Sequence, residues 1–285
     1  TNSTKPFKMI RLLQIEFIKL WNNRASKVLI ISYFVLLTSI ALVAAIKFDI
    51  GPVKFHLAEV GIFNFPYIWH FNTFVTAFFK LFLAIVIVSM MANEYSNKTI
   101  KQNLIDGLSK KEFILSKFLT VLSFALISTV FVFVVSLILG LVYSDFDELS
   151  IIFSDLEFVL AFFIKLVGFF SFCLFLGILV KRSAFALGFL IIWQILEGIT
   201  RGLIRWKLFD GDTTEMIMGF FPLQSMFNLI KEPVTRLEAV QTVADQVGEQ
   251  INLNYHVHWY EILIVLVWTA IFIYSSYALL KKRDL

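Results

Sequence analysis

The sequence predicts an all-α, polytopic membrane protein with six transmembrane helices, and its composition is the first evidence for this. Apolar residues (Ala, Val, Ile, Leu, Met, Phe, Trp, Tyr and Cys) make up 59% of the 285 residues, whereas only 16% are charged. Soluble proteins carry more charge, because their surfaces must face water. The second observation is that the apolar residues gather in runs of about 20, the length that a helix needs to cross roughly 30 Å of hydrocarbon.

Six such runs follow one another along the chain. They occupy residues 28–46, 69–92, 118–143, 158–180, 183–204 and 262–280. The second and fourth runs contain Lys80 and Lys165, and the fifth is weaker because it carries Glu197 and Arg201. The first run is too long for a signal peptide and lacks a small-residue cleavage site, so we expect it to remain in the protein.

Lysine and arginine residues in the connections predict the orientation of these spans. Sixteen of them lie before the first span, in the 93–117 connection, between the fourth and fifth spans, and after the last span; seven lie on the opposite side. Positively charged loops stay in the cytoplasm, so we expect a multi-pass protein of the cell (inner) membrane with both termini cytoplasmic. The same sorting accounts for the net charge of +4, and we therefore expect no nucleic-acid partner.

Residues 1–27 are predicted to form a cytoplasmic interfacial helix, followed by the six-span domain of residues 28–285. Apolar residues recur there at spacings of three and four: Phe7, Ile10, Leu13, Phe17, Leu20 and Trp21. Such an amphipathic helix lies along the membrane surface, with its basic residues toward anionic lipid. The asparagines and Arg24 before the first span predict a break between the two helices. Without that break, the segment would be a simple extension of the first span.

The connection between the second and third spans has the sharpest local pattern. Ser96 or Asn97 is predicted to cap a short helix, and Gly107 to end it in a left-handed conformation. Its apolar stripe consists of Ile100, Leu104, Ile105 and Leu108. Ser109 and Glu112 match the capping box that begins the next helix. We therefore expect a short helix held against the membrane between two long ones; the alternative is a solvated connector that is basic only because it is cytoplasmic.

The extracytoplasmic segment of residues 206–260 is long for a plain connection and predicts a helical cap. Asp212 and Glu215 are spaced as in another capping box, while Pro222 and Pro233 each precede an amphipathic stretch. The apolar faces of these stretches are Leu223, Met226, Phe227 and Ile230, then Leu237, Val240, Ala244, Val247 and Ile251. Two roles are open: the helices cover the exit of a translocation path, or they form a packed cap without a gating role.

Charged residues inside the spans form a candidate intramembrane site. Lys80 lies 11 residues after the start of its run, about 16 Å along a helix and therefore near the middle of the membrane. A cation there is costly and usually faces a bundle interior or water, so we expect Lys80 to line a cavity or a subunit interface, or to form a structural ion pair. Glu197 is the only acidic candidate partner within a span. Glu197 and Arg201 are four residues apart, so a local intrahelical pair is the simplest interpretation.

No motif indicates that this chain is an enzyme. It lacks the phosphate-binding loop of ATP-binding proteins and the His-Glu-x-x-His and Gly-x-Ser-x-Gly patterns of hydrolases. His256 and His258 lie beside Trp259 and Tyr260, which is more typical of an interfacial aromatic belt than of a metal site, because no third ligand is evident. We expect no bound metal. The single cysteine, Cys173, excludes an internal disulfide and lies in an apolar run as a small hydrophobic residue.

The connection also resembles the cytoplasmic loop of type-2 ATP-binding-cassette (ABC) exporter permeases. The residues that carry the resemblance are Glu94, Lys98-Thr99, Leu104, Gly107-Leu108-Ser109-Lys110, Phe113 and Lys117. Lys98 stands where the family commonly has Gly, and Lys110 where it commonly has Arg. The layout is similar as well: an N-terminal interfacial helix, six spans, both ends inside, and a large outer segment before the last span.

The resemblance implies a permease subunit of an ATP-driven exporter. In that family the short helix is a coupling helix, which sits in a cleft of a separate ATPase and passes its closing to the transmembrane helices. Carried over, the contact residues would be Thr99, Ile100, Lys101, Gln102, Leu104, Ile105 and Gly107, with Glu94 and Lys117 as anchors of the flanking helices. ATP and Mg²⁺ would be bound by the partner ABC ATPase subunits, and a second permease copy, identical or related, would complete the pathway.

A stand-alone secondary carrier or channel is the main alternative. Such a protein should show internal repeats, helices broken by Gly or Pro, and several ionisable residues at mid-membrane. The six runs contain no proline, and the two halves of the chain show no clear similarity. An intramembrane enzyme is disfavoured because the runs lack clusters of histidine and acidic residues. The abundant phenylalanine fits a hydrophobic cargo and plain lipid contact equally, so the sequence does not identify the substrate.

Overall fold

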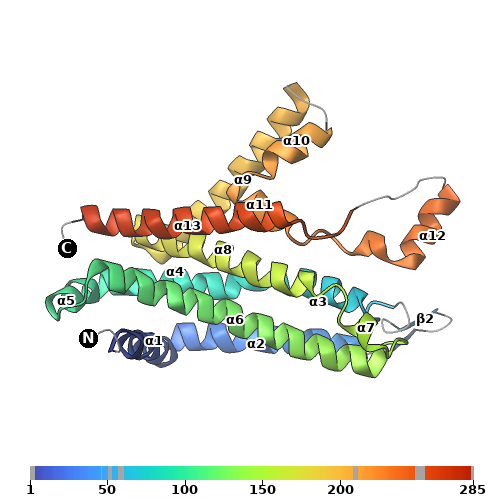
Figure 1. The fold of residues 1–285 in the computed structure, drawn as a ribbon, viewed down its shortest axis with the longest axis horizontal. Helices are drawn as coiled ribbons and strands as arrows, with labels where there is room; N and C mark the ends of the chain where they lie inside the picture. Colours follow the sequence, from blue (N-terminus) through green and yellow to red (C-terminus); the bar gives the residue numbers. More distant parts are fainter. Residues whose placement is uncertain are drawn as a thin grey trace.

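The computed structural model describes residues 4–45, 47–50, 53–56, 61–207, 211–247 and 254–283. Most of these residues lie in helices that form an elongated bundle, with α5 at one end and α7 at the other (Figure 1). A short antiparallel hairpin of β1 (Lys47–Ile50) and β2 (Val53–His56) follows the first long helix. The helical prediction holds for the bundle, whereas this hairpin was not predicted. Apolar and polar residues alternate along both of its strands, as in paired strands.

The long helices pack around a central one, α8. In chain order the helices are α1 (Thr4–Asn22), α2 (Arg24–Ala45), α3 (Tyr67–Ala77), α4 (Lys80–Ser96), α5 (Thr99–Ile105), α6 (Lys110–Tyr143), α7 (Leu149–Ile152), α8 (Glu157–Val180), α9 (Ser183–Lys207), α10 (Gly211–Met218), α11 (Pro222–Asn228), α12 (Glu238–Val247) and α13 (Trp259–Lys282). Helix α8 contacts α3, α4, α6, α9, α11 and α13. It is apolar on every side, as expected for a helix enclosed by neighbours.

Several helices are suited to a membrane by length and composition. Among the described residues, α6, the α7–α8 segment, α9 and α13 are each long and apolar enough to cross one. The number rises to six if each of two bent pairs, α1 with α2 and α3 with α4, counts as one span. The six apolar runs of the sequence coincide with α2, α3–α4, α6, α8, α9 and α13.

The predicted break before the first apolar run is confirmed. Helix α1 ends at Asn22 and α2 begins at Arg24, and the two axes meet at 93°. The side-chain oxygen of Asn23 accepts a hydrogen bond from the Ser26 backbone N–H at 3.0 Å. Asn23 therefore caps α2, because it satisfies a donor that has no partner within the helix.

The second apolar run is one continuous stretch in the sequence but two helices in the structure. Helices α3 and α4 meet at 45°, and the turn between them has tight bonds from Phe78 N to Val75 O and from Phe79 N to Thr76 O. The Thr73 and Thr76 hydroxyls donate back to carbonyls one turn earlier, at 2.6 and 2.7 Å. Such back-bonding is known to bend helices. The bend makes Lys80 the first residue of α4.

The outer segment contains the three predicted helices, α10, α11 and α12. Pro222 is in the first turn of α11, where its missing N–H costs nothing. Within the predicted apolar face, Leu223 and Met226 of α11 and Ile230, just beyond its end, are buried, but Phe227 is half exposed. Ile251, predicted as the last residue of the third apolar face, lies outside the described residues. Helix α9 leaves the bundle obliquely and carries α10 away from it (Figure 1).

Gly140 permits a close contact between α6 and the start of α3, which gives a first testable prediction. A Cβ atom at Gly140 would lie 2.2–2.7 Å from three ring atoms of Phe65, which is 1% exposed. Gly140→Ala is expected to destabilise the protein by about 1–3 kcal/mol, because the enclosed ring must shift. Gly188→Ala is the matched control, since nothing lies within 4 Å of that position. Thermal unfolding in detergent compares them; equal melting temperatures would contradict the prediction.

Candidate functional site

The connection between α4 and α6 folds as a short helix between two long ones. Gly107 has a φ of +92°, so the predicted left-handed helix end is confirmed. The capping box is confirmed too: the Ser109 hydroxyl accepts from Glu112 N at 3.2 Å, and the Glu112 carboxylate accepts from Ser109 N at 3.0 Å. Helix α6 then continues for 34 residues, about 50 Å at 1.5 Å per residue. Helix α5 is therefore joined, through residues 106–109 alone, to a long helix that runs along the bundle.

The start of α5 differs from the prediction that Ser96 or Asn97 caps it. The residue before the helix is Lys98, which has a φ of +55° and makes no capping bond with its side chain. Thr99 instead donates from its hydroxyl to the carboxylate of Glu94, and lies 3.3 Å from the Glu94 carbonyl oxygen. The prediction was wrong because a buried carboxylate from α4 holds the first turn of α5.

Glu94 belongs to a cluster of charges where α1, α4, α5 and α6 meet. This anchor cluster consists of Glu16, Lys19, Glu94, Thr99 and Lys117. The Lys117 Nζ atom, fully buried, lies 2.5 Å from a Glu16 carboxylate oxygen and 2.6 Å from one of Glu94. Lys19 contacts the same two carboxylates at 3.4 and 2.9 Å. Two acids and two bases are therefore shared among three helices, with no net charge left over.

The electrostatics of the anchor cluster favour the charged forms of Glu94 and Lys19. Glu94 lies two residues beyond the second apolar run, at the polar end of α4. Burial raises its pKa, but Lys117, Thr99 and Lys19 together outweigh burial and hold the pKa at about 2. Burial lowers the pKa of Lys19, but the nearby carboxylates of Glu16 and Glu94 raise it by more, so the pKa of Lys19 lies above its ordinary value. The ion pair between Glu94 and Lys19 is consequently charged on both sides at neutral pH.

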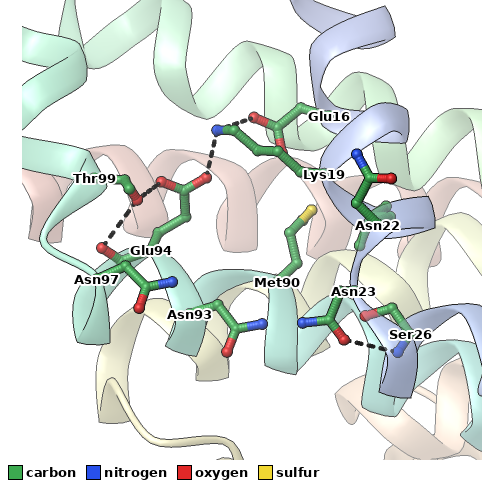
Figure 2. A pocket seen from close by; sticks show the side chains of 11 residues that line it. Glu16, Lys19, Asn22, Asn23, Ser26, Met90, Asn93, Glu94, Asn97 and Thr99 are labelled. Atoms are coloured by element: carbon green, nitrogen blue, oxygen red, sulfur yellow. Dashed lines mark hydrogen bonds and ion pairs between the residues drawn. The ribbon is translucent and has the colours of Figure 1, made fainter.

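A cavity of about 350 Å³ adjoins the anchor cluster, between α1 and α4. Figure 2 shows Glu94 reaching toward Lys19 on one side and Thr99 on the other, with the amides of Asn22, Asn23, Asn93 and Asn97 around the opening. Most of the residues that line this cavity are polar, so the cavity suits water better than hydrocarbon.

The outer surface of α5 has no covering within the described chain. Ile100 is 2% exposed and packs inward, and Leu104 is partly buried. Lys101, Gln102 and Ile105 face outward, and Ile105 is 75% exposed. The predicted apolar stripe is therefore wrong at Ile105. We call Lys98, Lys101, Gln102, Ile105 and Asp106, which are all exposed, the α5 tip.

Two further contacts tie this region to the chain's C-terminal helix. Lys110 Nζ donates to the carbonyl oxygens of Lys281 and Arg283 at 3.3 and 3.0 Å. The Arg283 guanidinium donates to the Tyr95 hydroxyl and to the Leu179 carbonyl, each at 2.9 Å. Sequence reasoning missed Arg283 and also Glu16. The signal for Glu16 is that it is the sole acidic residue of the first 27 and lies within the apolar stripe of α1.

The predicted anchors Glu94 and Lys117 are thus in contact. In the predicted intramembrane trio, Lys80 and Arg201 line one cavity, but the structure shows no ion pair among Lys80, Glu197 and Arg201. Glu197 accepts from the backbone N–H groups of Leu223 and Gln224 at 3.1 and 2.9 Å. Those groups open α11, and a helix N-terminus favours a carboxylate.

The other two members of the trio have separate partners. Arg201 pairs with Glu215 of α10, so the expected local pair of Glu197 with Arg201 is wrong. Lys80 lies over the ring of Phe169, 4.5 Å from its centroid. Within the described part of the chain, no three His, Cys, Asp or Glu side chains are grouped so that they could hold a metal ion.

Comparison with known proteins adds a family but no activity. The family described as protein of unknown function (DUF2705) matches residues 29–285, from the first long helix to the last residue. No curated protein matches the chain. Because the match covers most of the chain, from within α2 to the last residue and including the anchor-cluster residues of α4–α6, the chain belongs to the DUF2705 family.

Proposed function

We propose that this chain is the permease subunit of an ATP-driven ABC exporter in the cell membrane. Helix α2, the bent pair α3–α4, and helices α6, α8, α9 and α13 serve as its six spans, and α1 lies along the cytoplasmic surface. Both termini are cytoplasmic, and α10–α12 form the extracytoplasmic cap. Separate ATPase subunits bind ATP and Mg²⁺, and a second permease copy completes the pathway.

The observation that carries this proposal is the construction of α5. Thr99 at its base donates a hydrogen bond to Glu94, and Glu94 is itself held by buried ion pairs that join α1, α4 and α6, whereas the α5 tip is uncovered within the described chain. Removing one partner of a buried pair is expensive, so the base does not yield when the tip is pushed. A displacement of α5 is therefore passed to the helices that flank it.

The chemistry of the α5 tip fits a protein partner. Ile105, 75% exposed, projects beside the basic side chains of Lys98 and Lys101 at the end of the bundle that is rich in basic residues. An apolar anchor within a polar rim is typical of residues that contribute most to a protein interface. The surrounding lysines favour a partner surface with acidic side chains.

Co-expression tests the proposal directly. The tagged chain is produced together with each ABC ATPase of its source cell and purified in mild detergent. We expect one ATPase to co-purify in stable proportion, and export from energised vesicles to stop when ATP is removed. Purification of the chain alone with every candidate, combined with transport that survives ATP depletion, would favour the secondary carrier instead.

A further inference from the structure

A cavity of about 500 Å³ lies beside α9, where that helix diverges from the bundle. Its walls come from α3, α4, α8, α9 and α11, and most of its lining side chains are apolar. The bend between α3 and α4 contributes Phe78 and Lys80, and α8 contributes Lys165 and Phe169. The cavity thus depends on two features of the fold that the sequence did not predict, the bend between α3 and α4 and the oblique course of α9.

Two lysines line this cavity without an acidic partner. Lys165 is 2% exposed, and its Nζ atom lies 5.5 Å from the ring centroid of Phe227. Lys80, from α4, lies over the ring of Phe169 on α8. Among the side chains that the structure describes, no carboxylate is within 4.0 Å of either ammonium group, because Glu197 is bound to α11 and Glu215 to Arg201.

The two ammonium groups lie at a similar depth in the bundle. Lys80 is 16 residues from the α5 end of α4, and Lys165 is 15 residues from the corresponding end of α8. These separations are about 24 and 22 Å at 1.5 Å per residue. Both cations therefore face one small region, where they repel each other and where aromatic rings only partly replace their hydration.

The flank of the cavity is open through apolar side chains. Phe78, Leu81, Ile191 and Ile195 line it and are each at least half exposed on the surface of the bundle. With the helices spanning a membrane, this flank faces hydrocarbon. A ligand that enters there needs an apolar tail, and it needs an anionic head to neutralise the lysines within.

We propose that this cavity binds an anionic, lipid-like amphiphile. Its carboxylate or phosphate head lies between Lys80 and Lys165, and its hydrocarbon tail lies against Phe78, Leu81 and Ile191. This inference rests on the membrane placement in the proposed function but not on ATPase docking. The cavity therefore selects its ligand by the negative charge of the head group, whereas the apolar side chains accept hydrocarbon tails of different kinds.

Fluorescence titration of the purified chain in neutral detergent tests the site without any ATPase. The probe is cis-parinaric acid, and the competitors are palmitate, hexadecanol, phosphatidylglycerol, phosphatidylcholine and inorganic phosphate. We expect palmitate or phosphatidylglycerol to displace the probe at least about tenfold more effectively than its neutral or zwitterionic counterpart, as charge-assisted bonds would give. The anion that competes more strongly distinguishes a fatty acid from a phospholipid.

Three variants make the test specific. The double change Lys80→Gln with Lys165→Gln is expected to remove the preference for anions, while Lys207→Gln, an exposed cation outside the cavity, retains it. Ile191→Trp keeps both charges but fills the tail site, and so weakens binding even if the double variant folds poorly. Equal competition by palmitate and hexadecanol, an unchanged preference in the double variant, or competition by inorganic phosphate as strong as by palmitate would each overturn the proposal. ATPase co-purification is scored separately, so failure here leaves the docking proposal intact.

Discussion

Lys117→Met is expected to lower the melting temperature of the purified chain by at least about 6 °C. The substitution keeps a long unbranched side chain but removes the cation that lies 2.5 and 2.6 Å from two buried carboxylates. Leaving such carboxylates with only the half-exposed Lys19 costs about 3–5 kcal/mol, and each kcal/mol corresponds to about 2–4 °C in a chain of this size. Tryptophan fluorescence in detergent measures the transition.

Lys111→Met is the matched control for this prediction. Lys111 belongs to the same helix and carries the same charge, but its side chain is exposed, so its loss should change the melting temperature by about 1 °C or less. Adding Glu94→Gln to Lys117→Met should recover part of the loss, because only one buried carboxylate then remains beside Lys19. Equal effects of Lys117→Met and Lys111→Met would show that the buried ion pairs of the anchor cluster contribute no more to stability than an exposed lysine does.

Ile105→Glu is expected to abolish ATPase co-purification while leaving the fold intact. The side chain is 75% exposed, so the free chain loses little when it becomes charged. In a docked complex the same carboxylate would be buried in an apolar pocket without a partner, which weakens binding by tenfold or more. The measurements are the ratio of ATPase to permease after affinity purification and the melting temperature of the permease alone.

Leu149→Glu provides the control for the α5 tip. Leu149 is 71% exposed on α7, at the opposite end of the bundle (Figure 1), so the same chemical change there should leave ATPase recovery unchanged. Undiminished recovery with Ile105→Glu, in a variant that melts normally, would place the ATPase contact away from α5. Loss of recovery with both variants would instead indicate a general defect in assembly.

Features set by neighbouring residues were predictable from the sequence. The break at Asn23, the left-handed Gly107 and the capping box of Ser109 with Glu112 all depend on contacts within a few residues. Each has a local physical reason, such as an unpaired helix N–H or a φ that disfavours a side chain. The positions of the apolar helices were predictable for the same reason, since every stretch of about 20 apolar residues must be buried or face lipid.

The partners of buried charges were not predictable, because they depend on how distant helices meet. Glu197 was assigned to Arg201 by spacing, yet it binds the start of α11, 26 residues later. Glu16 was not predicted as a site residue, although it completes the anchor cluster by pairing with Lys117, 101 positions away. For Glu197 and for Glu16, the local sequence is compatible with more than one hydrogen-bonding partner, and the tertiary packing of the helices decides which one is used.

Arg283 has a practical consequence for work on this protein. Its guanidinium group donates to backbone carbonyls in the last turn of α8, including that of Leu179, which have no partner within the helix. It also donates to the hydroxyl of Tyr95 on α4. Truncating the chain before this arginine is a common step when preparing samples for crystals or cryo-microscopy. Here it would remove hydrogen bonds that join the end of α13 to α4 and α8.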